Sequence, residues 1–114
     1  MTEIRQTYGC AECGAQAAEI VVSAGEVRRE AHTGVMIMPV APELRERIVA
    51  ALGDPAALLA INLELAPFWC PECGAGYCVD HWRRELVFDH DPLPAWLDSI
   101  RGECPYGHER MVED

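Results

Sequence analysis

The 114-residue chain contains no lysine: all nine of its basic residues are arginine, against 19 acidic residues. The formal net charge is −10, and the pI is near 4.7. Nucleic-acid-binding proteins hold phosphates with clustered Lys and Arg side chains, and this chain has no basic stripe. We therefore expect no direct binding of nucleic acid. The short arginine clusters are predicted to be solvated faces: Arg28-Arg29, Arg45/Arg47 and Arg83-Arg84.

Long apolar runs are also missing. No run approaches the ~20 residues that a membrane-spanning helix needs, and residues 1–6 lack the apolar segment of a signal peptide. We therefore expect a soluble, cytoplasmic protein that does not contact a membrane. Disulfides rarely persist in that compartment, so three disulfide bridges among the six cysteines are not expected.

What the sequence does have is paired metal ligands. Two tetrahedral zinc sites need eight sulfur or nitrogen donors, and eight of the ten Cys and His residues fall into short pairs. These pairs are Cys10-x-x-Cys13, Cys70-x-x-Cys73, Cys78-x-x-His81 and Cys104-x-x-x-His108. Gly14 and Gly74 each follow a pair, where a tight turn around an ion requires positive φ. We predict two structural Zn²⁺ ions per chain.

The four pairs can be grouped in two ways. In a cross-brace the first and third pairs share one ion and the second and fourth share the other, which gives two Cys₃His sites. In a sequential ribbon the first two pairs form a Cys₄ site and the last two a Cys₂His₂ site. Only four residues separate Cys73 from Cys78, so the second and third pairs are neighbours in space in either case and the spacing leaves both groupings open.

The block Cys70-x₂-Cys73-x₄-Cys78-x₂-His81 resembles the middle of B-box-type and related cross-brace zinc fingers of the RING superfamily. The order of the four pairs is similar too, although the 56 residues between the first and second pairs exceed a typical RING loop. The resemblance favours the cross-brace grouping of the pairs and implies a ubiquitin-ligase-type component. Trp96 then lies in the segment where such ligases place an aromatic that contacts the partner. Arg110 lies near the position of the arginine that steadies the conjugating enzyme.

The remaining pattern predicts one small α+β domain over residues 1–114. Residues 17–23, 27–32 and 35–40 read as a short β-meander, with the charged middle stretch at an edge. A helical insertion is expected at about 42–60: one helix begins at Pro42, and Asp54-Pro55 caps a second. A strand is expected at 61–66 and a helix at 94–100. Residues 82–88 fit a strand or a helical turn.

No catalytic constellation is apparent. Eight donors close two zinc sites, whereas a catalytic zinc keeps a position open. A redox dithiol at Cys70 and Cys73 is disfavoured because Gly74 and Gly76 oppose the helix that such a site begins. His90, between two aspartates, is expected to be a solvated surface group. His32, in a strand with charged neighbours, is expected to have no functional role.

We therefore predict a non-catalytic, zinc-stabilised protein–protein interaction module whose partner is a basic protein. If the chain is part of an enzyme at all, it would be a RING-like transferase scaffold with no catalytic residue of its own, and its partner would be a conjugating enzyme. A third hypothesis is a thiol- and zinc-based redox-responsive regulator, because thiolate sites can release metal on oxidation.

Overall fold

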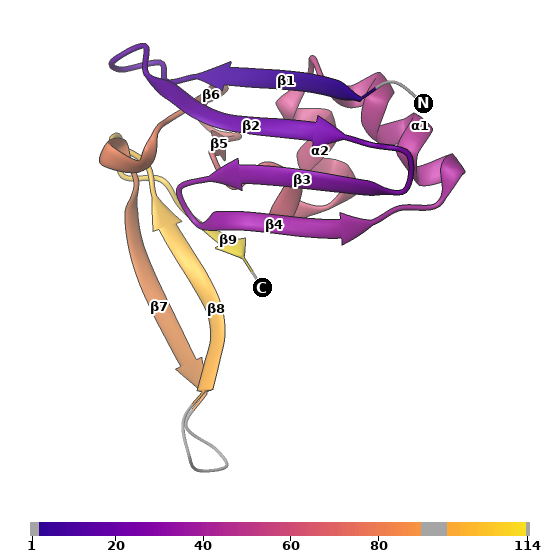
Figure 1. The fold of residues 1–114 in the computed structure, drawn as a ribbon. Coiled ribbons are helices and arrows are strands. Elements are labelled where there is room, and N and C mark those ends of the chain that lie inside the picture. Colours follow the sequence, from indigo (N-terminus) through magenta and orange to yellow (C-terminus); the bar gives the residue numbers. More distant parts are fainter. Residues whose placement is uncertain (1–2, 90–95, 114) are drawn as a thin grey trace.

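The computed structural model describes residues 3–89 and 96–113. The N-terminal part is an antiparallel sheet in the order β1-β2-β3-β4, with two helices packed on one face (Figure 1). The elements are β1 (Ile4–Gly9), β2 (Gln16–Val22), β3 (Glu26–Ala31), β4 (Gly34–Pro39), α1 (Pro42–Ala51) and α2 (Pro55–Ile61). The predicted small α+β domain with a meander and two short helices is confirmed.

Strand register places most of the buried apolar residues of the meander on the face that meets the helices, while Val35 and Ile37 lie exposed on the other face. Val22 is opposite Ile4 on one side and Val27 on the other. Because side chains alternate along a strand, the opposite face carries charged residues. On that face Arg5 lies 3.3 Å from Glu19.

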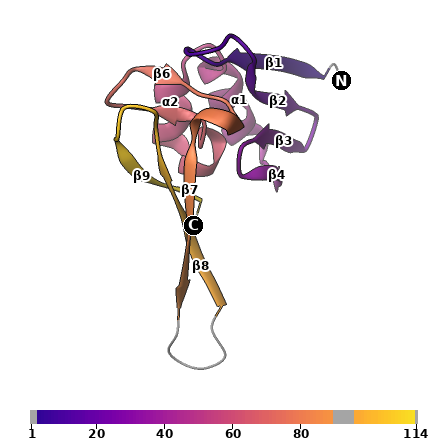
Figure 2. The same ribbon diagram turned by 90° about the vertical axis from the view of Figure 1, so that its left-hand side faces the viewer.

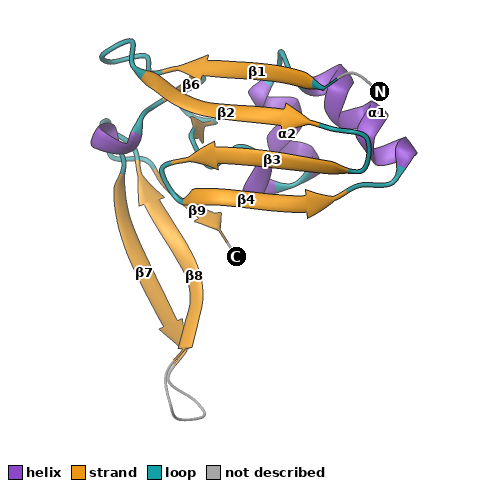
Figure 3. Cartoon of the chain, viewed as in Figure 1, coloured by secondary structure: helices purple, strands orange, loops and turns teal. Residues whose placement is uncertain are grey.

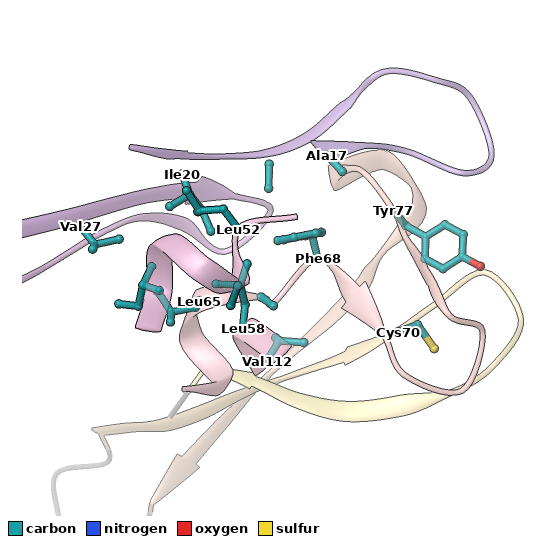
Figure 4. Packing of buried hydrophobic residues seen from close by; sticks show 14 of the residues in the cluster. Ala17, Ile20, Val27, Leu52, Leu58, Leu65, Phe68, Cys70, Tyr77 and Val112 are labelled. Carbon is teal, nitrogen blue, oxygen red and sulfur yellow. The ribbon is translucent and has the colours of Figure 1, made fainter. Parts of the chain in front are cut away.

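The helices start where proline and a cap favour them. Pro42 occupies the first turn of α1, and the Asp54 side chain accepts a hydrogen bond from the Ala57 N–H at the start of α2. Ile48 of α1 and Leu58 of α2 are fully buried. Figure 4 shows Leu58 packed with residues from both halves of the chain, which form one core: Ile20, Leu52, Leu65, Phe68 and Val112.

The C-terminal half consists of short elements and one projecting hairpin. The elements are η1 (Leu63–Leu65), β5 (Trp69–Cys70), β6 (Ala75–Gly76), η2 (Val79–His81), β7 (Arg83–Asp89), β8 (Trp96–Glu103) and β9 (Glu109–Glu113). Strands β5 and β6 pair with each other, and β7, β8 and β9 form an antiparallel sheet in that order (Figure 3). The β7–β8 hairpin extends away from the body of the molecule (Figure 2).

Strand positions in the meander differ from the sequence prediction. Residues 4–9, which lie outside the predicted meander, form β1, because β2 supplies a partner for its alternating half-buried side chains. The predicted edge position of residues 27–32 is wrong: β3 lies between β2 and β4. Arg29 is fully buried on the inner face and donates to the carbonyls of Glu64 (2.6 Å) and Gly34 (3.1 Å). It is therefore not part of a solvated face.

Two further predictions, the strand at 61–66 and the helix at 94–100, are wrong. A local cap accounts for the first difference and strand pairing with distant residues accounts for the second. The predicted strand at 61–66 is the end of α2 followed by η1, where the Asn62 side chain accepts from the Glu64 N–H at 2.9 Å. Residues 96–100 belong to β8 and not to a helix, while 94 and 95 lie outside the described residues. Gly102 lies within β8, where an added Cβ would come 3.0 Å from both Trp82 and Val112. Residues 83–89 form a strand, one of the two alternatives.

None of the described helices has the length and apolar character to cross a membrane.

Candidate metal centres

The eight paired Cys and His residues come together in two groups of four. The first cluster contains Cys10, Cys13, Cys78 and His81. The second cluster contains Cys70, Cys73, Cys104 and His108. Within each cluster the donor atoms all lie within 4.8 Å of one another, so each could hold one metal ion. The pairs are interleaved in the order that distinguishes the cross-brace from the ribbon.

The first cluster joins the N-terminal sheet to the C-terminal half. Its first pair lies in the loop between β1 and β2; in its second pair Cys78 precedes η2 and His81 is the last residue of η2. The loop is a tight turn in which the Gly14 N–H donates to the Cys10 carbonyl (2.9 Å) and Gly14 has φ of 76°. The positive φ predicted from the sequence at this glycine is therefore present.

The second cluster joins the β5–β6 turn to the turn between β8 and β9. The Gly74 N–H donates to the Cys70 carbonyl (2.9 Å), repeating the geometry of the first turn, and Gly74 has φ of 65°. In the other turn Gly107 has φ of 87° and its N–H donates to the Cys104 carbonyl (3.0 Å). Two elements far apart in sequence thus present two donors each.

Both histidines face the sulfurs through Nδ1. His81 Nδ1 lies 3.5 Å from Cys10 Sγ and 3.2 Å from Cys78 Sγ. His108 Nδ1 lies 3.2 Å from Cys73 Sγ and 3.4 Å from Cys104 Sγ. This leaves Nε2 of His108 directed outward, 3.3 Å from the Glu72 carboxylate. Metal-bound imidazoles commonly carry such a carboxylate partner on the other nitrogen.

Burial and backbone N–H groups act in opposite directions on the sulfurs. Burial favours the neutral Cys10 thiol, but backbone N–H donors, led by that of Cys78, outweigh it and lower the pKa of Cys10 to about 6. At Cys70 burial dominates and raises the pKa to about 11, and burial also raises the pKa of Cys78. At Cys104 backbone N–H donors overcome burial and lower the pKa. Each cluster thus combines a buried cysteine whose thiolate is favoured by backbone N–H donors with a buried cysteine whose thiolate is disfavoured by burial and would be stabilised by a nearby cation.

The clusters are connected to each other through the first loop. The Ala11 N–H donates to the Gly76 carbonyl (2.9 Å), which ties this loop to β6. The Tyr106 hydroxyl donates to the Glu12 carboxylate, which ties it to the last ligand turn. Sequence reasoning missed Glu12, Glu72 and Tyr106. The feature of the sequence that could have identified these three residues is their position between the two members of a ligand pair.

His32 has a structural role that the sequence did not predict. It is 4% exposed and stacks on Trp82, with ring centroids 4.9 Å apart and planes at 13°. Its Nε2 lies 2.7 Å from the Pro67 carbonyl, so Nε2 carries the proton and donates. Burial, with the nearby charge of Arg84, lowers the pKa of His32 to about 4. The residue therefore joins the sheet to the metal-binding half as a neutral imidazole.

The other residues considered for function are placed as follows. Arg110 is used internally: its Nη1 donates to the carbonyls of Ala66 (2.9 Å) and Trp69 (2.7 Å). Trp96 begins β8. His90 lies outside the described residues, so the prediction made for it stays a prediction.

Comparison with known proteins assigns the chain to a family. The family model for a domain of unknown function (DUF8328) matches residues 1–114, and the chain belongs to this family. No curated protein and no solved structure matches it. The chemistry of the two clusters is therefore what bears on function.

Proposed function

We propose that this DUF8328 member binds two structural Zn²⁺ ions, one in each cluster, and acts as a non-catalytic protein–protein interaction module. The dimensions of the clusters carry the proposal. A tetrahedron with Zn–S of about 2.3 Å and Zn–N of about 2.0 Å has S···S edges of about 3.8 Å and S···N edges of about 3.5 Å. The Cys13–Cys78 and Cys73–Cys104 sulfurs are 3.6 and 3.7 Å apart. The sulfur-to-Nδ1 separations of 3.2–3.6 Å fit as well.

The donor sets support a structural role for both ions. Each cluster offers four donors, as many as tetrahedral zinc takes, whereas catalytic zinc keeps a position for water or substrate. Each Cys₃His site would carry a formal charge of −1. The ions would join the ligand loops in a cross-brace arrangement.

The charge of the chain supports a basic protein as the partner. Two Zn²⁺ add four positive charges and six thiolates add six negative ones, so the loaded chain is near −12. Asp80 and Glu109, next to ligands of the two clusters, are both exposed. A partner with exposed Arg or Lys side chains would be attracted to this side of the molecule.

Native mass spectrometry with a count of reactive thiols tests the zinc assignment. We expect two zinc ions per chain, with all six thiols protected until a chelator is added. One ion or none, with thiols that are free or bridged before chelation, would contradict it.

Titration with a basic and an acidic peptide of equal length, followed by tryptophan fluorescence, tests the partner assignment. We expect binding of the basic peptide only, weaker at high salt. Asp80→Asn with Glu109→Gln should lower its affinity about threefold or more. The matched control, Glu43→Gln with Glu46→Gln on α1, removes the same charge far from the clusters. Equal affinity of the two double variants would argue against this surface.

A second candidate is a ligase-type component, favoured by the interleaved grouping of the pairs. It would position a conjugating enzyme loaded with a ubiquitin-like protein. Arg110 counts against it, because its guanidinium is committed to the carbonyls of Ala66 and Trp69. An assay that follows discharge of the ubiquitin-like protein from the loaded conjugating enzyme tests this candidate. If the chain does not accelerate the discharge, or if Trp96→Ala leaves the acceleration unchanged, the candidate is ruled out.

A further inference from the structure

The two clusters differ in how well their sulfurs are protected from solvent. All six cysteines lie among the described residues, and of these six Cys13 is the one that is exposed. Its counterpart in the second cluster, Cys73, is half-buried. The other four cysteines are buried and belong to the hydrophobic core, and Cys73 packs against that core. Cys13 neither belongs to the core nor packs against it.

The difference follows from where each pair lies in the fold. Residues 11–16, which surround Cys13 in the β1–β2 loop, are exposed throughout. In the second cluster the side chain of Tyr77, 2% exposed, interacts with the Cys73 sulfur and lies near Cys70 (Figure 4). Tyr106 packs beside Tyr77, with ring centroids 6.3 Å apart. Tyr77 thus covers Cys73 in the second cluster, whereas Cys13 in the first cluster is an exposed residue.

The exposed sulfur has a buried partner within short reach. Cys78 Sγ lies 3.6 Å from Cys13 Sγ, and Cys78 follows β6 at the base of η2. A disulfide requires the sulfurs to close to about 2.05 Å. Residues 11–15, which carry Cys13, can supply that movement, because they are exposed and none of them belongs to the core.

We propose that the first cluster is a peroxide-sensitive site in which Cys13 is oxidised and then joined to Cys78. This goes beyond the structural role and rests on zinc binding by the clusters. The Cys13 thiolate attacks a peroxide, an S–O bond forms as O–O breaks, and hydroxide leaves; sulfur loses two electrons and peroxide gains them. The Cys78 thiolate then attacks the resulting sulfenic acid. The S–S bond forms as S–O breaks, and the second oxygen leaves as water after protonation.

Oxidation would leave the first cluster with two donors, Cys10 and His81, too few to retain a tetrahedral ion. The second cluster keeps all four. The product is therefore a chain with one ion, in which a covalent link replaces the metal between the β1–β2 loop and η2. The loop would also be pulled relative to its contacts with Gly76 and Tyr106, which changes the surface around the cluster.

Graded oxidation of the zinc-loaded wild-type chain tests the proposal. Zinc content is measured before peroxide is added, so a failure of zinc binding is recognised separately. Released zinc is then followed with a colorimetric chelator, while alkylation and peptide mass mapping identify oxidised thiols. We expect one ion released about tenfold faster than the other, given the exposure of its ligand, together with a Cys13–Cys78 disulfide. Simultaneous release of both ions, first oxidation in the second cluster, or a first disulfide without Cys13 would overturn the proposal.

Two matched variants locate the sensitive sulfur. Cys13→His keeps four donors in the first cluster but removes its exposed sulfur, and it should abolish the fast phase of release. Cys73→His makes the same change in the second cluster and should leave the fast phase unchanged. A fast phase that persists in Cys13→His with two bound ions would overturn the proposal. If either variant fails to bind two ions, the proposal is judged on which thiols are oxidised first in the wild-type chain.

Discussion

His32 is a single side chain that links two distant parts of the sequence. It follows β3, and it contacts Trp82 after the third ligand pair and the Pro67 carbonyl before the second. Its carbonyl also accepts from Arg84 at the base of the hairpin. These contacts help to hold the sheet against the C-terminal half, so the neutral imidazole contributes to the stability of the fold.

The low pKa of His32 makes stability depend on pH. In the unfolded chain the imidazole has its ordinary pKa of 6.5, whereas in the folded chain its pKa is about 4. Between these values the unfolded chain binds more protons, so stability is complete above pH 6.5 and is lost as pH falls toward 4. From pH 6.5 to 5 the loss should be about 1.5 kcal/mol.

Urea unfolding of wild type and His32→Gln across this range, in excess zinc, checks the value. The glutamine amide can still donate to Pro67 but does not titrate, so His32→Gln should have a flatter profile. Both chains lose metal in acid alike, so the difference between them isolates the histidine. Parallel profiles would show that His32 does not titrate differently in the folded state.

At the scale of elements, the ligand turns depend on glycines in the left-handed region. Gly74 has φ of 65° and follows Cys73, the second donor of its turn. A Cβ at this φ is strained by about 1–2 kcal/mol, although nothing lies within 4 Å of where it would be. Gly74→Ala should therefore lose about that much stability and weaken zinc binding at the second cluster.

Gly53→Ala is the matched control for Gly74→Ala. Gly53 also has open space around it, but it is not among the positive-φ glycines. The alanine there should be neutral or slightly stabilising, because it reduces the freedom of the unfolded chain. Thermal unfolding together with a competitive zinc titration distinguishes the two; equal effects would show that backbone conformation at Gly74 is not what matters.

At the scale of the whole molecule, the fold is one core held from two sides by the clusters. Val112 from β9 packs with Leu58 and Ile20, so the halves are not independent. A structural zinc can contribute on the order of 10 kcal/mol, comparable to the 5–15 kcal/mol of an entire domain. Removing both ions with a chelator should therefore unfold the chain cooperatively or lower its melting temperature by roughly 20 °C or more.

Circular dichroism before and after chelation, with zinc restored at the end, checks this expectation. Near-ultraviolet signal from Trp69 and Trp82, which lie beside the clusters, should disappear with the metal and return with it. An unchanged melting temperature after verified loss of both ions would show that the apolar core alone sustains the fold.

The sequence by itself determined the eight paired ligands, the glycine turns beside them, the meander from residue 17 onward and the starts of both helices. These features are local: a ligand spacing, a positive φ, a cap or an apolar period depends on neighbouring residues. Tertiary structure alone decided the interleaved grouping of the pairs, the presence of β1 and β9, and the strand at residues 96–103. It also decided the burial of Arg29 and His32 and the exposure of Cys13. Strand pairing and burial depend on residues that are distant in the chain, and those partners appear only once the chain has folded.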